Sequence, residues 1–185
     1  MCVVVGPDYV AEWKAKYGGE PPDDPKDARW LGLVSRHVHG YLRAFSERCH
    51  ARGVRFNVAF TGFDIADRHA FETYAIDWKA LAAEGVFDGV YVLNIKLDAA
   101  DPWTCTRQVY QYVMAHRGKA DVYFPVSTYD FGHSGIPSYV KATGLSAGEV
   151  AKRLLSLARE AGARGIVMEC VDYGNYTPEI CEALR

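Results

Sequence analysis

The sequence predicts an α/β protein built on a parallel β-sheet. Four short apolar runs are typical of buried strands, and they alternate with stretches whose apolar residues recur every three or four positions, as on one face of a helix. Strands that alternate with amphipathic helices are typical of βαβ units, in which the strands lie parallel. No Pro- or Gly-rich linker divides residues 1–185, so we expect a single α/β domain.

The N-terminal part of the chain is predicted to be mostly helical. Apolar side chains recur at helical spacing in residues 8–17 and again, over a much longer stretch, in residues 28–51. The Pro- and Asp-rich residues 20–27 form the predicted loop between these two helices. Residues 1–5 are apolar and could add the end of a fifth strand.

Strands and helices then follow in a regular order. The four predicted strands are residues 54–61, 89–94, 121–127 and 165–170. The helices that follow them are predicted at residues 78–83, 103–116, 146–161 and 178–185. Typical helix-start residues support these predictions, namely Asp77, Asp101-Pro102, the Ser146/Glu149 capping box and Thr177-Pro178. Residues 62–74 and 128–144 are predicted loops. Pro125 lies inside the third strand and removes a hydrogen-bond donor, so we expect a bulge or a strand end there.

The fourth strand carries the most informative side chain. Glu169 follows a near-continuous apolar run, which is typical of a parallel strand whose two faces are both covered by helices. Enzymes of the α/β class place their reactive groups at the carboxyl ends of such strands. Burial would raise the pKa of Glu169, as a general acid requires. The alternative is a structural ion pair with a basic residue of a neighbouring strand, such as Lys96.

Composition excludes several classes of function. The formal net charge of −2 leaves no basic footprint for nucleic acid or for an anionic membrane surface. The five cysteines are widely spaced and form no CxxC or Cys/His cluster, so we expect reduced thiols and no metal site. The chain has no signal peptide and no apolar run of about 20 residues, so a cytoplasmic protein is expected.

Motifs for common cofactors and nucleophiles are also missing. The sequence contains neither GxGxxG nor GxxxxGK[ST], which are the phosphate-binding fingerprints of dinucleotide and nucleotide sites. It contains no GxSxG elbow of a serine hydrolase. We therefore expect no cofactor, and we expect the ligand to be a carbohydrate or another small polar molecule.

Two architectures agree with four strands. One is a small open parallel α/β sheet, and the other is part of a TIM (β/α)8 barrel. Two helices precede the first complete strand without a strand between them, which favours an elaborated barrel loop. A half-barrel would have two open sheet edges, so self-association through these edges is expected.

A resemblance extends the barrel interpretation. The segment YVAEWKAKYGGEPPDDPKDARWLGLVSRHVHGYLRAF resembles a stretch of glycosyl-hydrolase-like (β/α)8 barrels from uncharacterised bacterial proteins. The matching features are Tyr17-Gly18, the acidic loop Pro22–Pro25, Trp30-Leu31, Arg36 and Leu42-Arg43. Residues 76–92 are similar to a later Asp-Trp, helix, Gly and strand unit of the same barrels. The resemblance implies that the chain is the C-terminal half of such a barrel, roughly strands five to eight. The acidic stretch that ends the fourth strand of the family has no counterpart in this sequence.

The candidate site residues lie where the predicted strands end. Glycoside hydrolysis needs two carboxyl groups, for which Glu169 and Asp98 are the candidates. The candidate substrate-binding residues are Asn94, Lys96, Tyr129, Asp172 and Tyr173. Asp98 could instead cap its loop, and the tyrosines could pack over the barrel mouth. The sequence therefore predicts a glycoside-hydrolase-like segment that acts on or binds a carbohydrate. The alternatives are a non-catalytic sugar-binding or scaffold domain, and a small open α/β ligand-binding domain.

Overall fold

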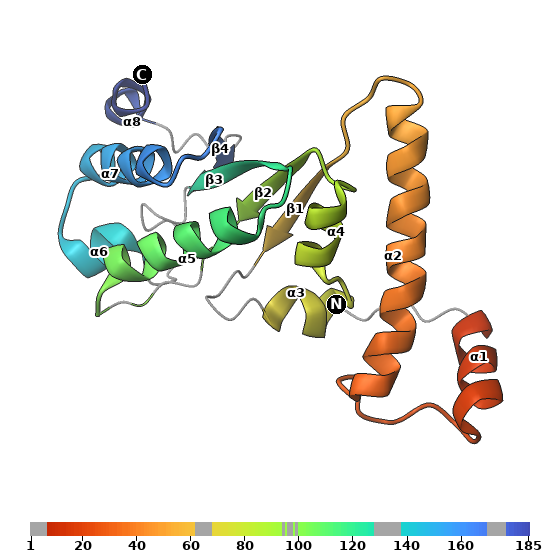
Figure 1. Ribbon diagram of the computed structural model, residues 1–185. Helices are drawn as coiled ribbons and strands as arrows, with labels where there is room; N and C mark the ends of the chain where they lie inside the picture. The colour runs from red at the N-terminus through yellow and green to blue at the C-terminus, as the bar shows by residue number, and fades with distance from the viewer. Residues whose placement is uncertain are drawn as a thin grey trace.

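The chain forms an α/β structure around one four-stranded, all-parallel open sheet (Figure 1). The computed structural model describes residues 7–61, 68–93, 95, 98, 100–127, 138–169 and 177–185, and the side chains of all of these except Pro7, Arg68, His69 and Glu169. The strands are β1 (Asn57–Thr61), β2 (Gly89–Leu93), β3 (Asp121–Ser127) and β4 (Gly165–Glu169), and they are hydrogen-bonded in the order β1-β2-β3-β4. The prediction of a parallel α/β protein is therefore confirmed.

Helices alternate with these strands. They are α1 (Pro7–Tyr17), α2 (Ala28–His50), α3 (Arg68–Tyr74), α4 (Trp78–Glu84), α5 (Pro102–His116), α6 (Tyr139–Thr143), α7 (Ala147–Glu160) and α8 (Pro178–Ala183). Helices α3 and α6 correct the sequence prediction, because they lie in segments that were predicted to be loops. Each has too few turns for its apolar periodicity to stand out from the surrounding sequence. No helix in the described ranges is long and apolar enough to cross a membrane.

The predicted helix starts are confirmed by their hydrogen bonds. The carboxylate of Asp77 accepts the amide of Ala80 at the start of α4, at 3.1 Å. Asp101 caps α5 in the same way. At the start of α7, the amide of Ser146 donates to the Glu149 carboxylate at 2.8 Å, and the Ser146 hydroxyl accepts the Glu149 amide at 3.3 Å. These bonds satisfy amides that have no partner inside the helix.

Each strand pairs with the next strand along the chain. Val58 pairs with Val90, and Val90 pairs with Val122, so the register passes straight across β1, β2 and β3. Crossovers between parallel strands are right-handed. When each crossover moves to the next strand in the same direction across the sheet, right-handedness places all of the connecting helices on one face. Strand order alone therefore places the helices that connect the strands on one face of the sheet.

Most of the buried strand side chains lie on this helix-covered face, whereas Pro125 and Ser127, which are also buried, lie on the opposite face. Phe60, Val92 and Phe124 belong to the main core, which also contains side chains of α4, α5 and α7. The ring of Phe124 stacks on Tyr110 of α5, with centroids 3.6 Å apart and planes 9° apart. A second core joins Val126 of β3 to α6, α7 and α8.

The opposite face of the sheet, which we call the open face, is lined differently. Side chains alternate between the two faces of a strand, so the residues between the core positions line the open face. Its middle row consists of Ala59, Tyr91, Tyr123 and Gly165, which are register partners in succession. Ala59 is exposed, and the other three are only partly buried. Strand β4 was expected to be covered by helices on both faces, and this expectation is wrong. Strand β4 lies at the edge of the sheet, and its Met168 is 40% exposed. An apolar run in the sequence does not distinguish an edge strand of this kind from a strand that is covered on both faces.

Pro125 lies within β3 without a bulge, which corrects a second expectation. The register of β3 with β4 continues uninterrupted to the end of β3. The carbonyl of Val122 accepts the amide of Arg164, so the backbone of Val122 is directed toward β4. Successive residues of a central parallel strand are directed to alternate neighbours, so the backbone of Pro125, three positions later, is directed toward β2. The register of β2 with β3 extends to the pair of Tyr91 and Tyr123, and Pro125 lies beyond that pair. The missing donor is therefore directed away from the ladder with β4.

Helix α2 extends well beyond the sheet. Its 23 residues span about 35 Å, whereas a strand of five residues spans about 17 Å. The C-terminal half of α2 lies against β1 and α4, where Ser46 donates to the Val86 carbonyl at 2.7 Å. The N-terminal half packs with Trp13 of α1 and with Ala75 in a separate third core (Figure 1). Because Ala75 follows β1, this third core lies toward the carboxyl edge of the sheet.

His39 connects the extended part of α2 to the start of α4. Its Nε2 accepts the backbone amide of Asp77 at 2.9 Å and lies 3.2 Å from the Ser35 hydroxyl. This acceptor role requires a neutral ring with its proton on Nδ1. Burial and then the positive charge of Arg43 lower the pKa of His39, against the opposing charges of Asp77 and Glu84.

We expect His39 to make the fold less stable in mild acid. The unfolded chain takes up this proton at about pH 6.5, and the folded protein takes it up only at lower pH. The free energy of unfolding therefore decreases as the pH falls below about 6.5 and stops decreasing below the folded pKa. Urea unfolding between about pH 8 and about pH 5.5 should show a weaker pH dependence for His39→Gln than for the wild type. Equal pH dependence in the two proteins would contradict this role of His39.

Candidate functional site

The carboxyl edge of the sheet holds the main predicted site residue. Glu169 is the last residue of β4, and its register partner on β3 is Ser127. Side chains two positions apart on a strand point to the same face. Pro125 and Val167 are register partners on the open face, and Ser127 and Glu169 each follow two positions later, so they belong to the open face as well. In parallel α/β folds, ligands bind at this edge of the sheet.

Ser127, at the end of β3, is a buried polar side chain at this edge. It is 2% exposed, whereas Thr61 at the end of β1 is only partly buried. The Thr61 hydroxyl lies 3.3 Å from the phenol oxygen of Tyr74. The strand ends therefore provide polar groups on a framework that is otherwise apolar.

Asp98, the second predicted carboxylate, is held by its own loop. It lies after β2 and is exposed, and its Oδ1 accepts the amide of Ala100 at 2.9 Å. This short-range bond is the loop-capping arrangement that the sequence offered as the alternative role. One oxygen remains available to a ligand, because the bond uses a single carboxylate oxygen.

The predicted substrate-binding residues lie outside the described part of the chain. These are Asn94, Lys96, Tyr129, Asp172 and Tyr173. Their predicted roles therefore stay predictions. The aromatic residue Trp103, near the start of α5, is described. Its ring packs between Tyr139, at 4.9 Å, and the guanidinium of Arg153, at 4.8 Å, so it belongs to the helix layer.

Asn57 lies at the amino edge of the sheet. It begins β1 and pairs with Gly89, the first residue of β2. A Cβ on Gly89 would come within 2.6 Å of the Asn57 side-chain oxygen, so the exposed Asn57 side chain lies directly over Gly89. The first strand was predicted to begin at Val54, and it begins at Asn57. The amide of Phe56 is used outside the ladder, where it donates to the Asp88 carboxylate at 2.6 Å.

A charged cluster at the amino edge stabilises the starts of the strands. Asp88 also lies 2.8 Å from His50 Nε2, and Arg55 donates to the Asp121 carboxylate at 2.7 Å. Burial opposes ionisation of Asp88, but the bonds from Phe56 and His50 outweigh it and keep the pKa of Asp88 below its ordinary value. This cluster joins α2 to the first three strands. In parallel folds, polar groups at this edge serve stability and not catalysis.

Two tyrosines on the open face were missed by sequence reasoning. Tyr91 and Tyr123 are register partners, and their rings meet edge to face with centroids 4.9 Å apart. Each belongs to an apolar strand run, GVYVL or DVYFPVS, in which nothing marks the tyrosine as facing away from the core. Counting alternate positions from a known core residue would have revealed them.

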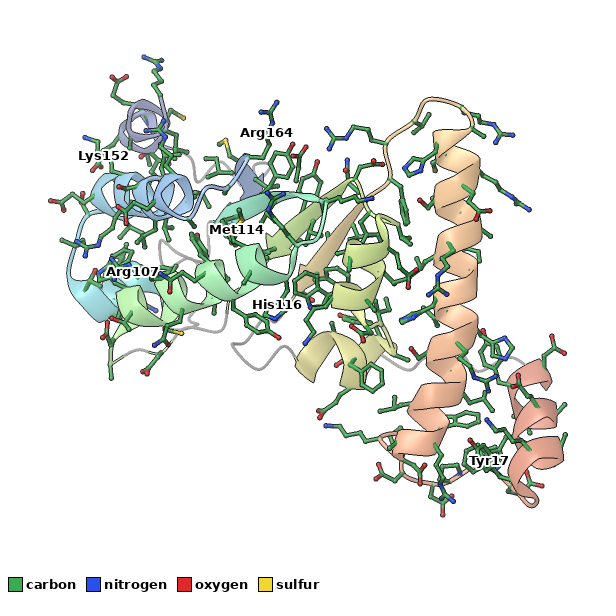
Figure 2. All side chains as sticks on the ribbon, viewed as in Figure 1. Tyr17, Arg107, Met114, His116, Lys152 and Arg164 are labelled. Carbon is green, nitrogen blue, oxygen red and sulfur yellow. The ribbon has the colours of Figure 1, made fainter. Side chains whose placement is uncertain are left out.

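Two cavities between described residues lie away from the carboxyl edge. One, of about 240 Å³, lies where α5 and α7 end and β3 and β4 begin, and Arg117, Asp121 and Arg164 line it. The other, of about 410 Å³, lies between α5 and α7, lined by residues such as Arg107 and Met114, which Figure 2 labels along α5. Neither cavity is lined by a predicted site residue. The described residues also include no cluster of three His, Cys, Asp or Glu side chains that could hold a metal ion.

Comparison with known proteins adds no assignment. No protein-family model matches the chain, and no curated protein matches it.

Proposed function

We propose that this chain forms one half of a (β/α)8 barrel and acts on or binds a carbohydrate at the carboxyl edge of its sheet. The observation that carries the proposal is the position of Glu169, which ends a parallel strand on the open face. In a closed barrel this face becomes the interior, and residues at its carboxyl edge surround the substrate. A carboxyl group at that position suits acid and base catalysis of glycoside hydrolysis.

Strand order supports a barrel over a doubly wound sheet. In doubly wound folds the order reverses at a switch point, and helices cover both faces. Here the order β1-β2-β3-β4 has no reversal, and the strand side chains of the main core lie on one face. The middle row of the open face also mixes large and small residues, with Tyr91 and Tyr123 between Ala59 and Gly165. Large side chains from other strands would fill the space above the small ones, because barrel interiors are packed.

The two open edges have apolar surroundings that further strands and helices would cover. Beside β1, Tyr41 of α2 is 67% exposed and stacks on Phe45, and Val54 is exposed as well. On β4, Met168 is exposed. Unpaired parallel edges with exposed apolar side chains favour association, so self-association of the isolated chain stays a prediction.

A closed barrel made from two identical copies is disfavoured by the helix layer. Helix α2 precedes β1 and packs beside it through Phe45 and Phe56, while α8 follows β4 and packs on α7. A barrel has one outer helix for each crossover between strands. If β4 of one copy paired with β1 of another, α8 and α2 would compete for the same place. Closure therefore fits a partner segment that lacks one of these helices.

The two candidate carboxylates suit different roles. Glu169 would act as the general acid that protonates the leaving oxygen, because enclosure in a closed barrel would favour its protonated form. Asp98, exposed in its loop, would serve as base or nucleophile. Asn94 and Lys96 would bind sugar hydroxyls, together with Asp172. Tyr129 and Tyr173 would stack on sugar rings.

A non-catalytic sugar-binding domain is the second candidate. The bond between Asp98 and the Ala100 amide favours it, because a carboxylate held by its own loop is a weaker candidate for the second catalytic group. Binding of oligosaccharides without turnover is the result that would support this candidate. A small open α/β ligand-binding domain is the alternative if the sheet has no partner.

The catalytic proposal predicts a large effect of Glu169→Gln. On a panel of aryl glycosides we expect this variant to lose about 10²–10⁴-fold in kcat/KM, the usual contribution of a general acid. The matched control is Glu160→Gln, because Glu160 is an exposed glutamate on α7 whose carboxylate accepts the Ser156 hydroxyl of the same helix. We expect the control to retain wild-type activity. Activity that is unchanged in Glu169→Gln would remove Glu169 from catalysis.

A further inference from the structure

The smaller of the two cavities is lined by two arginines. It lies at the amino edge of the sheet, where α5 and α7 end and β3 and β4 begin, and its volume is about 240 Å³. Arg117 and Arg164 line it together with one acidic residue, Asp121. One water molecule occupies about 30 Å³ in the liquid, so the cavity has room for a ligand larger than water.

The backbone fixes where the two arginines lie. Arg117 directly follows α5, and Arg164 directly precedes β4, as Figure 2 shows. The Arg164 amide donates to the Val122 carbonyl at 2.9 Å, which extends the pairing of β3 with β4 by one residue. Side chains alternate between the faces of a strand, and Gly165 belongs to the open face. Arg164 is therefore placed on the side of the sheet that carries α5 and α7, as Arg117 is.

The charges around the cavity are unbalanced. Among the described residues, no ion pair joins Arg117 or Arg164 to an acidic side chain. The carboxylate of Asp121 is already paired, because the guanidinium of Arg55 donates to it at 2.7 Å. The two arginines that line the cavity therefore leave an excess of positive charge, which attracts an anion.

Arg117 is held in place for such a ligand. It is only partly exposed, and its guanidinium donates to the Ala120 carbonyl at 2.8 Å. A guanidinium carries five N–H donors in a planar fork, and this bond uses one of them while it fixes the direction of the group. An oxyanion that accepts from the other donors would form charge-assisted hydrogen bonds. A donor that is already oriented loses little freedom on binding, which favours affinity.

The larger cavity, between α5 and α7, differs in its charges. Arg107 lines it, and so does the acidic residue Glu160. Opposite charges on its walls give no preference for an anion. Arg107 is an exposed arginine on α5 and does not line the smaller cavity, so it provides a matched control of the same residue type.

We propose that the smaller cavity binds a small oxyanion of the phosphate class between the guanidinium groups of Arg117 and Arg164. This site lies at the edge of the sheet opposite to Glu169, so it is separate from the proposed carbohydrate site and does not rest on the proposed function. A bound anion would connect the turn before β3 to the turn before β4. Because it binds only the folded chain, it would also stabilise the fold.

Titration with inorganic phosphate, followed in amide NMR spectra, tests the proposal. The titration is run at about pH 7.5, where phosphate is mostly dianionic, with potassium chloride adjusted to keep the ionic strength constant. We expect saturable shifts of the amide signals of residues 117–121 and 162–164. Arg117→Gln and Arg164→Gln should each weaken binding about tenfold, the usual effect of losing one charge-assisted hydrogen bond. Arg107→Gln removes the same charge and should leave the affinity unchanged.

Arg164→Gln is the variant that decides the result. Arg164 is exposed, and its side chain forms no bond to another described residue, so we expect this variant to fold even if Arg117→Gln does not. Arg164→Lys, which keeps the charge and loses the planar fork, should bind phosphate with intermediate affinity. The absence of saturable shifts in the wild type would overturn the proposal. Equal weakening in Arg107→Gln and Arg164→Gln would also overturn it, because the attraction would then come from diffuse surface charge.

Discussion

Replacing Phe124 by alanine should destabilise the protein by about 3–5 kcal/mol. Phe124 is completely buried on the helix-covered face of β3, and its ring stacks on Tyr110 of α5. Truncation leaves a cavity between the sheet and α5 that rigid neighbours on both sides cannot fill. Urea unfolding, followed by circular dichroism, measures the change in the free energy of unfolding.

The adjacent residue provides a matched control on the other face. Tyr123 precedes Phe124 in β3 and belongs to the open face, where it contacts Tyr91 and retains partial exposure to solvent. We expect Tyr123→Ala to cost about 1 kcal/mol in the isolated chain, a typical value for a partly exposed side chain. The difference between these two variants measures how differently the two faces are covered.

The oligomeric state decides how the comparison is interpreted. Size-exclusion chromatography should accompany the unfolding measurements, because association over the open face would bury Tyr123. Under that condition Tyr123→Ala would also become costly, and its cost would increase with protein concentration. Equal costs for both variants in a protein that is monomeric at every concentration would contradict an open face.

Replacing Gly118 by alanine should be the second severe change. Gly118 lies in the turn between α5 and β3 with φ of +56°, and a Cβ there would lie 2.3 Å from the carbonyl oxygen of Ala82 in α4. The clash is with backbone, so relief requires α4 to move relative to the turn. We expect a loss of about 3 kcal/mol or more in the free energy of unfolding, which is the combined effect of left-handed strain and overpacking.

Gly53 separates the two causes. It follows α2 with φ of +69°, and a Cβ there would have no neighbour within 4 Å. Gly53→Ala therefore isolates the backbone strain, for which we expect about 1 kcal/mol. Equal losses for Gly53→Ala and Gly118→Ala, measured by the same unfolding assay, would show that close packing of the turn against α4 is unimportant.

Local signals in the sequence were sufficient for most of the framework. Asp77, Asp101 and the Ser146/Glu149 pair start their helices as expected, because a cap depends only on residues within one turn. The start of β1 was misplaced because it depends on a distant residue. The carboxylate of Asp88 takes the Phe56 amide, and no pattern near Phe56 indicates this contact.

The position of the candidate site along the chain was predictable from the sequence, whereas the pairing of its residues across the sheet was not. An apolar run that ends in a carboxylate located Glu169 at the carboxyl edge of β4, because position along a strand can be read from sequence. The partner of each residue across the sheet is a tertiary property. Ser127 was recognised as a strand end, yet its pairing with Glu169 follows only from the register. Tyr91 and Tyr123 were missed for the same reason.

The order β1-β2-β3-β4 also bears on how the chain folds. Register partners on neighbouring strands are 32 residues apart in the chain for β1-β2 and β2-β3 and 42 apart for β3-β4, so no pairing has to wait for a distant part of the chain. Loops of this length close at a modest entropic cost, and topologies of low contact order fold quickly. The sheet can therefore grow by successive addition on the ribosome, with β1 and β2 paired before β4 has been made. A nascent chain of this kind exposes its growing edge at every stage, so protection by chaperones would matter most before β4 docks.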